Sequence, residues 1–139
     1  PERAERSVWL AGTTATVGLG AVAVLYIVFD DALVGLFTDD PAVLSVGAEC
    51  LRVIAYGHVV LAWAMILPQA FNGAGDTMTP TYINLACYWA LQLPLAWALA
   101  LPLGLGELGV YVTIVVAEVA AASFAVILFR RGRWKAAVV

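Results

Sequence analysis

Charged side chains are scarce in this chain of 139 residues, where Asp, Glu, Lys and Arg together make up 12%. A soluble domain carries about 25% charged and about 45 to 50% apolar residues, whereas this chain is 63% apolar. No water-soluble core explains that excess. The seven basic residues leave a net charge of −3 and form no basic stripe along the chain, so we expect no nucleic-acid partner.

Cysteine and histidine are almost absent as well. The two cysteines, Cys50 and Cys87, lie far apart in the sequence and form neither a disulfide framework nor a metal site. His58 is the only histidine, and no nucleophile or metal-ligating cluster lies near it in the sequence. The sequence therefore predicts no catalytic residue, no cofactor and no metal, and we expect no enzyme.

The apolar residues form four runs that are each long enough to cross a bilayer core of about 30 Å as a helix. We expect membrane helices over residues 8–29, 41–71, 82–103 and 110–129. The second begins before the membrane, because Asp40 and Pro41 are typical of a helix N-cap followed by proline at the first position. The predicted fold is an all-α, polytopic membrane helix bundle that occupies the whole chain, 1–139.

Basic residues gather on one side of this predicted bundle. If the four helices alternate in direction, six of the seven basic residues lie at one membrane surface, and they are Arg3, Arg6, Arg130, Arg131, Arg133 and Lys135. Arg52 falls on the other side, where we expect it to pair with Glu49 one helical turn away. Basic loops are retained in the cytoplasm, so both ends of the chain should be cytoplasmic in a cell inner membrane. Trp9 and Trp134 are expected as anchors at this interface.

Glu118 is the one formal charge inside the apolar runs themselves, which are residues 8–29, 53–71, 82–103 and 110–129. A carboxyl at membrane depth costs about 2.5 to 3.5 kcal/mol on insertion scales, so Glu118 should face a partner or water rather than lipid. Two interpretations stand. Glu118 binds a proton or a cation during transport, or it is a protonated side chain that bonds a neighbouring helix.

Further polar side chains line the second and third predicted spans, and they are His58, Gln69, Asn72, Asn84 and Gln92. These residues either line a cavity for an ion or a substrate, or they hold helices together at about 0.6 kcal/mol each. Asp76, in the turn between the two spans, either hydrogen-bonds the backbone of the turn, which we call its turn chemistry, or is an ion ligand. Pro68 and Pro94 each remove a helical hydrogen bond and bend their helices, which makes them candidate hinges.

The turn from Gly73 to Pro80 follows the pattern G-x-G-D-T-x-x-P, which resembles a turn of the multidrug and toxic compound extrusion (MATE) family. The opening residues 1–9 and the closing residues 129–135 are similar to segments of the same family. The resemblance covers the whole chain as helices nine to twelve of about twelve. Because the chain opens with Pro1 rather than Met, we expect a fragment that forms part of the second of two six-helix lobes.

The resemblance implies a secondary active antiporter that exports small organic cations in exchange for protons or sodium. Its expected partners are the lipid bilayer, the missing N-terminal helices of the same transporter and the organic cation. Asn72 stands where many relatives have an arginine, and the apolar part of the second span carries no acid. The coupling carboxylate therefore lies in this chain or, at least as plausibly, in the missing first lobe.

Three other functions are compatible with membrane helices. A lipid-linked oligosaccharide flippase of the wider superfamily needs many basic residues for a pyrophosphate, and these spans offer only Arg52. A membrane-embedded enzyme needs a convergent catalytic set, which the sequence lacks. A bundle without transport activity is the third, although bent helices with polar stripes are unusual for it.

Overall fold

The computed structural model describes residues 2–132 and 134, and these residues are predominantly helical. Pro1, Arg133 and Lys135, which the sequence predictions use, lie outside the described residues. The elements are six α-helices and one π-helix: α1 (Glu2–Val28), α2 (Asp30–Gly35), α3 (Pro41–Gly73), α4 (Met78–Asn84), the π-helix η1 (Leu85–Gln92), α5 (Leu93–Ala100) and α6 (Gly106–Arg130). Because α4, η1 and α5 follow one another without a loop, four helices are long and apolar enough to cross a membrane. The predicted all-α polytopic bundle is confirmed.

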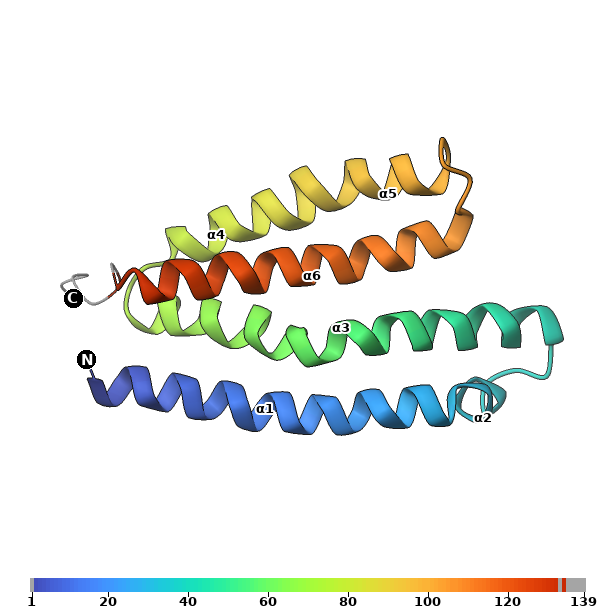
Figure 1. Ribbon diagram of the computed structural model, residues 1–139, viewed down its shortest axis with the longest axis horizontal. Helices are drawn as coiled ribbons and strands as arrows, with labels where there is room; N and C mark the ends of the chain where they lie inside the picture. Colours follow the sequence, from blue (N-terminus) through green and yellow to red (C-terminus); the bar gives the residue numbers. More distant parts are fainter. Residues whose placement is uncertain (1, 133, 135–139) are drawn as a thin grey trace.

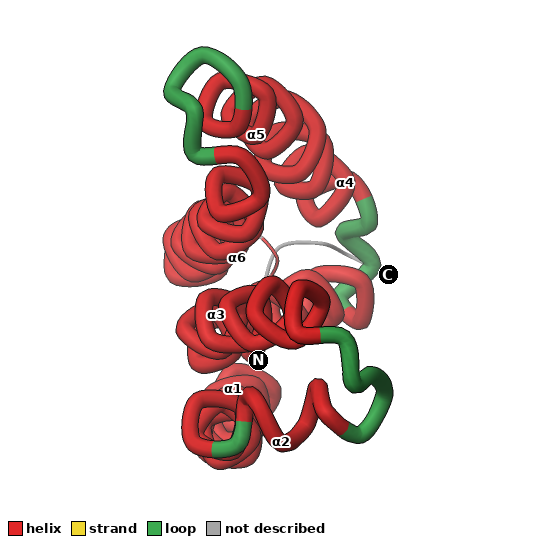
Figure 2. The backbone as a smooth tube through the Cα atoms, turned by 90° about the vertical axis from the view of Figure 1, so that its right-hand side faces the viewer, coloured by secondary structure: helices red, strands yellow, loops and turns green. Residues whose placement is uncertain are grey.

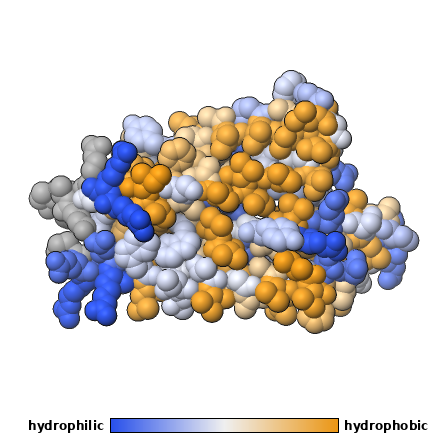
Figure 3. Space-filling view, in the orientation of Figure 1, coloured by the Kyte–Doolittle hydropathy of each residue, from blue (hydrophilic) through white to orange (hydrophobic). Residues whose placement is uncertain are grey.

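The four spans lie side by side in one row (Figure 1 and Figure 2). α3 packs against α1 on one side and α6 on the other, and α6 packs in turn against η1 and α5. The start of α1, the end of α6 and the α3–α4 turn lie at one end of the row (Figure 1). Hydrophilic side chains gather near the ends of the visible face, with apolar side chains between them (Figure 3). This distribution suits a bilayer around the middle of the row.

Small side chains let the helices approach closely. On α6 buried small residues recur at every fourth position, at Gly109, Thr113, Ala117, Ala121 and Ala125, and Ala122 is buried beside them. Gly12 on α1 is buried, and the Trp63 ring of α3 occupies the space that a Cβ at Gly12 would need. In lipid, where apolar surface gains little by leaving its solvent, such close packing is what holds helices together.

Aromatic rings fill the end of the row near the start of α1. The Phe129 ring stacks on Trp134 with ring centroids 4.9 Å apart and planes 10° apart, and the Trp134 indole donates to the Phe129 carbonyl at 3.0 Å. Trp9 packs against Trp63 at 5.3 Å, and the Arg130 guanidinium lies 5.7 Å from the Trp9 ring. Trp134, which the sequence predicts as an anchor at the membrane interface, has its ring buried in this cluster.

The connection between α1 and α3, at the end of the row opposite to the start of α1, is not a simple loop. The segment between the first two spans contains the short helix α2 before the chain turns into α3. Asp40 caps α3 as the sequence predicts, since its carboxylate accepts from the Ala42 amide at 2.9 Å and Pro41 follows at the first position. α3 then runs 33 residues, through Pro68, to Gly73.

Substitution of Gly109 tests the close contact between α5 and α6. A Cβ at this position would lie 2.9 Å from backbone atoms of Leu99 and Ala100, so Gly109→Ala must push the two helices apart. We expect it to lower the free energy of unfolding by about 1 to 3 kcal/mol, measured by unfolding in detergent. The matched control is Gly18→Ala, where nothing lies within 4 Å. That control should be neutral or stabilising, and equal effects of both variants would contradict the packing.

Candidate functional site

A partly polar groove lies between α3 and the α4–η1 segment. Its volume is about 500 Å³, and it is lined by Ala64, Met65, Ile66, Pro68, Gln69, Asn84 and Tyr88. The Asn72 amide, one turn beyond Gln69, donates to the Gln69 side-chain oxygen at 3.4 Å. The structure thus brings together three of the residues that the sequence predicts for a pathway, Gln69, Asn72 and Asn84. A mostly apolar concave surface with a few polar groups is typical of a small-molecule site.

The third span carries a π-helix, η1, which the sequence reasoning missed. Pro94 lies just after it and lacks the amide that would donate to the Ala90 carbonyl. π-helical segments are rare and often occur at functional sites. Pro94 was the available signal, because a proline at this depth forces the hydrogen-bond ladder to change. The roles of Pro68 and Pro94 as hinges stay predictions.

Glu118 lies at the contact between α6 and α3. Its Oε2 atom is buried without a hydrogen-bond partner, and it lies against Gly57 in the space that a Cβ there would occupy. His58 and Tyr88 are close enough for their charges to interact with that of Glu118. Tyr88 also lines the groove, so it links the groove to the carboxyl.

The two other polar residues of the second and third spans lie away from the groove. The Nδ1 atom of His58 is 3.1 Å from the Ile54 carbonyl, and the His58 ring meets the Tyr26 ring at 5.3 Å. These contacts give His58 a packing role. Gln92 is half-buried at the end of η1 and is not among the residues that line the groove.

Asp76 organises the turn between α3 and α4. Its carboxylate accepts from the Thr79 amide at 3.0 Å and from the Thr79 hydroxyl at 2.6 Å, and its own amide donates to the Phe71 carbonyl at 2.9 Å. Gly75 takes a positive φ of 84°, which glycine adopts without strain. The turn chemistry is therefore confirmed, and the role of Asp76 as an ion ligand stays a prediction.

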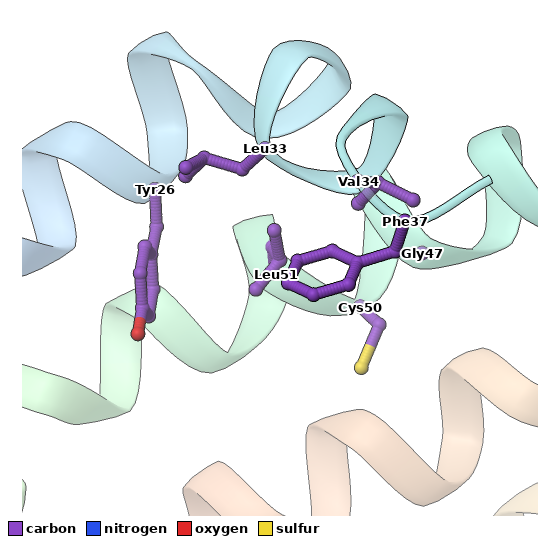
Figure 4. A pocket seen from close by; sticks show the side chains of 7 residues that line it. All are labelled: Tyr26, Leu33, Val34, Phe37, Gly47, Cys50 and Leu51. Carbon is purple, nitrogen blue, oxygen red and sulfur yellow. The ribbon is translucent and has the colours of Figure 1, made fainter.

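A second, apolar pocket of about 460 Å³ lies between α1, α2 and α3, at the end of the row opposite to the start of α1. Figure 4 shows the Phe37 ring crossing toward Leu51, with Tyr26 at the other side of the pocket. α2 is fixed over this region by an ion pair, because Arg52 donates to the buried Asp30 carboxylate through Nε at 2.8 Å and also through Nη2. The predicted pairing of Arg52 with Glu49 is wrong. Arg52 pairs with Asp30 instead, because the Asp30 carboxylate is already held in place by a hydrogen bond from the Asp31 amide.

Among the described residues, no three His, Cys, Asp or Glu side chains lie close enough together to hold a metal ion. Cys50 is half-buried and Cys87 is buried, and both are free thiols. Cys50 lies beside the apolar pocket of Figure 4 and Cys87 in the core. The polar chemistry of the described chain therefore concentrates in the groove, at Glu118 and at the two ends of the row.

Four helices long and apolar enough to cross a membrane are typical of a multi-pass membrane protein. The MatE family model matches residues 1–98, and the chain belongs to this family. The chain is similar to the probable multidrug resistance protein NorM of Caulobacter vibrioides, with 34% identity over 99 residues, which are 71% of this chain and 21% of that protein.

Two further relatives extend the comparison. The probable multidrug resistance protein NorM of Thermotoga maritima is 24% identical over 114 residues, which are 82% of this chain and 25% of that protein. Protein DETOXIFICATION 30 of Arabidopsis thaliana is 27% identical over 111 residues, which are 80% of this chain and 22% of that protein. The chain thus spans about a fifth to a quarter of the length of these curated relatives. No solved structure matches it.

The Asp30–Arg52 pair predicts a pH dependence. Hydrogen bonds from Arg52, with a further one from the Asp31 amide, hold the pKa of Asp30 below its ordinary value. A carboxyl with a lowered folded-state pKa stabilises the fold fully above its unfolded value of about 3.9, and this stabilisation is lost as the pH falls through the lower folded value.

Asp30→Asn should therefore remove part of the acid sensitivity of the folded protein in detergent, measured as the unfolding temperature from pH 7 down to pH 2. Asp39→Asn, in the same connection between α1 and α3, is the control and should keep the wild-type profile. An unchanged profile in Asp30→Asn would show that the ion pair contributes nothing to stability.

Proposed function

We propose that this chain is the C-terminal portion of the second lobe of a multidrug antiporter, which exports small organic cations in exchange for protons or sodium. Family membership supports a transporter, and the relatives from Caulobacter vibrioides and Thermotoga maritima carry the description "probable multidrug resistance protein". The observation that carries the proposal to this chain is the groove beside Pro68, because it combines apolar walls with amide and phenol groups.

The lining of the groove suits an organic cation. Apolar side chains such as Met65 and Ile66 take up the hydrocarbon part of a substrate, and Met adapts its shape to different ligands. The side-chain oxygens of Gln69 and Asn84 attract a positive charge, and an aromatic ring such as that of Tyr88 attracts a cation through its face. A groove with few fixed charges and an adaptable side chain such as Met65 favours binding of several related cations rather than one.

The groove forms one wall of the proposed pathway, and the other wall comes from the missing N-terminal helices. Alternating access in transporters of this type moves one repeat against the other around the binding site. α3 with Pro68 and the third span with η1 and Pro94 are the proposed places where the motion is absorbed.

We assign both ends of the chain to the cytoplasmic side of a cell inner membrane. Arg3 and Arg6 at the start of α1, and Arg130 and Arg131 at the end of α6, lie at the same end of the row (Figure 1). The positive-inside tendency places such an end in the cytoplasm. A flippase for pyrophosphate-linked lipids is the weaker alternative, because Arg52, in the first half of α3, is already paired with Asp30.

The groove residues provide the test of this function. In cells that make the full-length transporter, Gln69→Ala and Asn84→Ala should each raise the half-saturating concentration for efflux of the cationic dye ethidium about 2- to 12-fold. This range corresponds to the loss of one hydrogen bond of about 0.5 to 1.5 kcal/mol.

Thr14→Ala is the matched control, since Thr14 is exposed on α1 and bonds only the Leu10 carbonyl of its own helix. Its efflux should equal that of the wild type. If neither groove variant changes the half-saturating concentration, the groove is not part of the substrate pathway. Full-length protein that exports no organic cation would end the proposal.

A further inference from the structure

Glu118 occupies a place that a simple structural role does not explain. Its Oε2 atom is buried and has no hydrogen-bond partner within the part of the chain that the structure describes. A polar group buried without a partner is unfavourable, and a charged one is far more so. A carboxyl that only held two helices together would use both oxygens for hydrogen bonds, so this one is free to accept something else.

The space for this carboxyl comes from the opposite helix. Gly57 on α3 has no side chain, and the Oε2 atom fills the position where a Cβ would stand. A side-chain methyl of Val115, one turn before Glu118 on α6, lies 3.4 Å from the same position. The pocket around Oε2 is therefore small, largely apolar and built by a glycine that faces the acid.

The surroundings favour a proton over a metal cation. Metal cations such as Ca²⁺ and Mg²⁺ take six or more oxygen ligands, whereas the titratable neighbours here are His58 on α3 and Tyr88 on η1, with Cys87 beside Tyr88. α5 carries no titratable side chain. A proton needs only one lone pair, which the unpartnered oxygen supplies.

We propose that Glu118 is a proton-binding site of this transporter, that Gly57 makes the room for it, and that Tyr88 links it to the substrate groove. The inference rests on the proposed function and names one coupling residue within it. When the proton leaves Oε2 for water, the carboxylate gains a negative charge beside His58 and Tyr88. Because Tyr88 also lines the groove, that charge changes how strongly the groove holds a cation, which is the linkage an antiporter needs.

Infrared difference spectroscopy of the full-length transporter tests the site without any substrate. In a pH titration, the wild type should show, among its protonated-carboxyl bands, one band that disappears in Glu118→Gln. Glu107→Gln is the control, because Glu107 is exposed in the first turn of the same helix and its loss should leave that band in place. A band that survives in Glu118→Gln, or a wild type without the band, would overturn the inference.

A second measurement tests the link to the groove. Binding of tetraphenylphosphonium, an organic cation, is followed by calorimetry in two buffers of different protonation enthalpy, which gives the number of protons released. The wild type should release about one proton per cation bound and Glu118→Gln none, with binding itself retained. Equal proton release in both proteins, or sodium release in place of protons, overturns the inference while leaving the proposed function standing.

Gly57→Ala should act like a weak form of Glu118→Gln, since the added methyl displaces the carboxyl. We expect it to shift the pH midpoint of tetraphenylphosphonium binding, whereas Gly18→Ala, in open space on α1, should not. The same midpoint in Gly57→Ala and the wild type counts against the site. Full-length protein that binds and exports no cation would instead remove the proposed function, and the infrared result would still decide the proton site.

Discussion

The cost of leaving a polar group unpaired away from water shapes this molecule more than any other constraint. A helix pairs every backbone amide and carbonyl in its interior, so the chain forms long helices wherever it is apolar. Two departures from regular α-helical hydrogen bonding, the missing amide of Pro68 inside α3 and the π-helix η1 before Pro94, both lie in the helices that border the groove. Irregular helical hydrogen bonding and polar side chains thus occur together, where a cavity can supply water or a ligand.

The contacts between helices depend on small residues rather than on large interlocking ones. The buried face of α6 is mostly glycine, threonine and alanine. On α3, Gly57 is the small residue that faces Glu118. Close approach of the two backbones brings the acid to a helix that has no side chain at the point of contact. The same property that holds α3 and α6 together therefore creates the space for an ionisable group.

Local sequence patterns were enough to predict much of the fold. The apolar runs predicted the four spans, Asp40 with Pro41 predicted the start of α3, and the glycine-rich pattern predicted the turn around Asp76. Each depends on residues within a few positions of one another. Of the candidate site, Gln69 and Asn72 were predictable for the same reason, since helical spacing puts them on one face of the second span, and Asn84 was predictable as a polar residue of the third span.

Contacts between distant segments were not predictable in this way. Arg52 has a nearby acid in Glu49, yet it pairs with Asp30, which folding brings alongside. Trp134 reads as an interface residue, and only the position of Phe129 shows that it is buried. The stripe through Gln92 assumed a regular α-helix, and η1 changes the number of residues per turn in between, so Gln92 no longer follows Asn84 and Tyr88 into the groove.

The spatial order of the helices differs from their order of synthesis. Of the four spans, α6 comes last in the sequence, yet it lies between α3 and α5, both of which leave the ribosome before it. The earlier helices can form hairpins with their neighbours in sequence, but the position between α3 and α5 is filled only when α6 inserts. Glu118 lies on that helix, which has the highest mean hydropathy of the four spans, so the acid enters the membrane on the most apolar span and in the same event that closes the row.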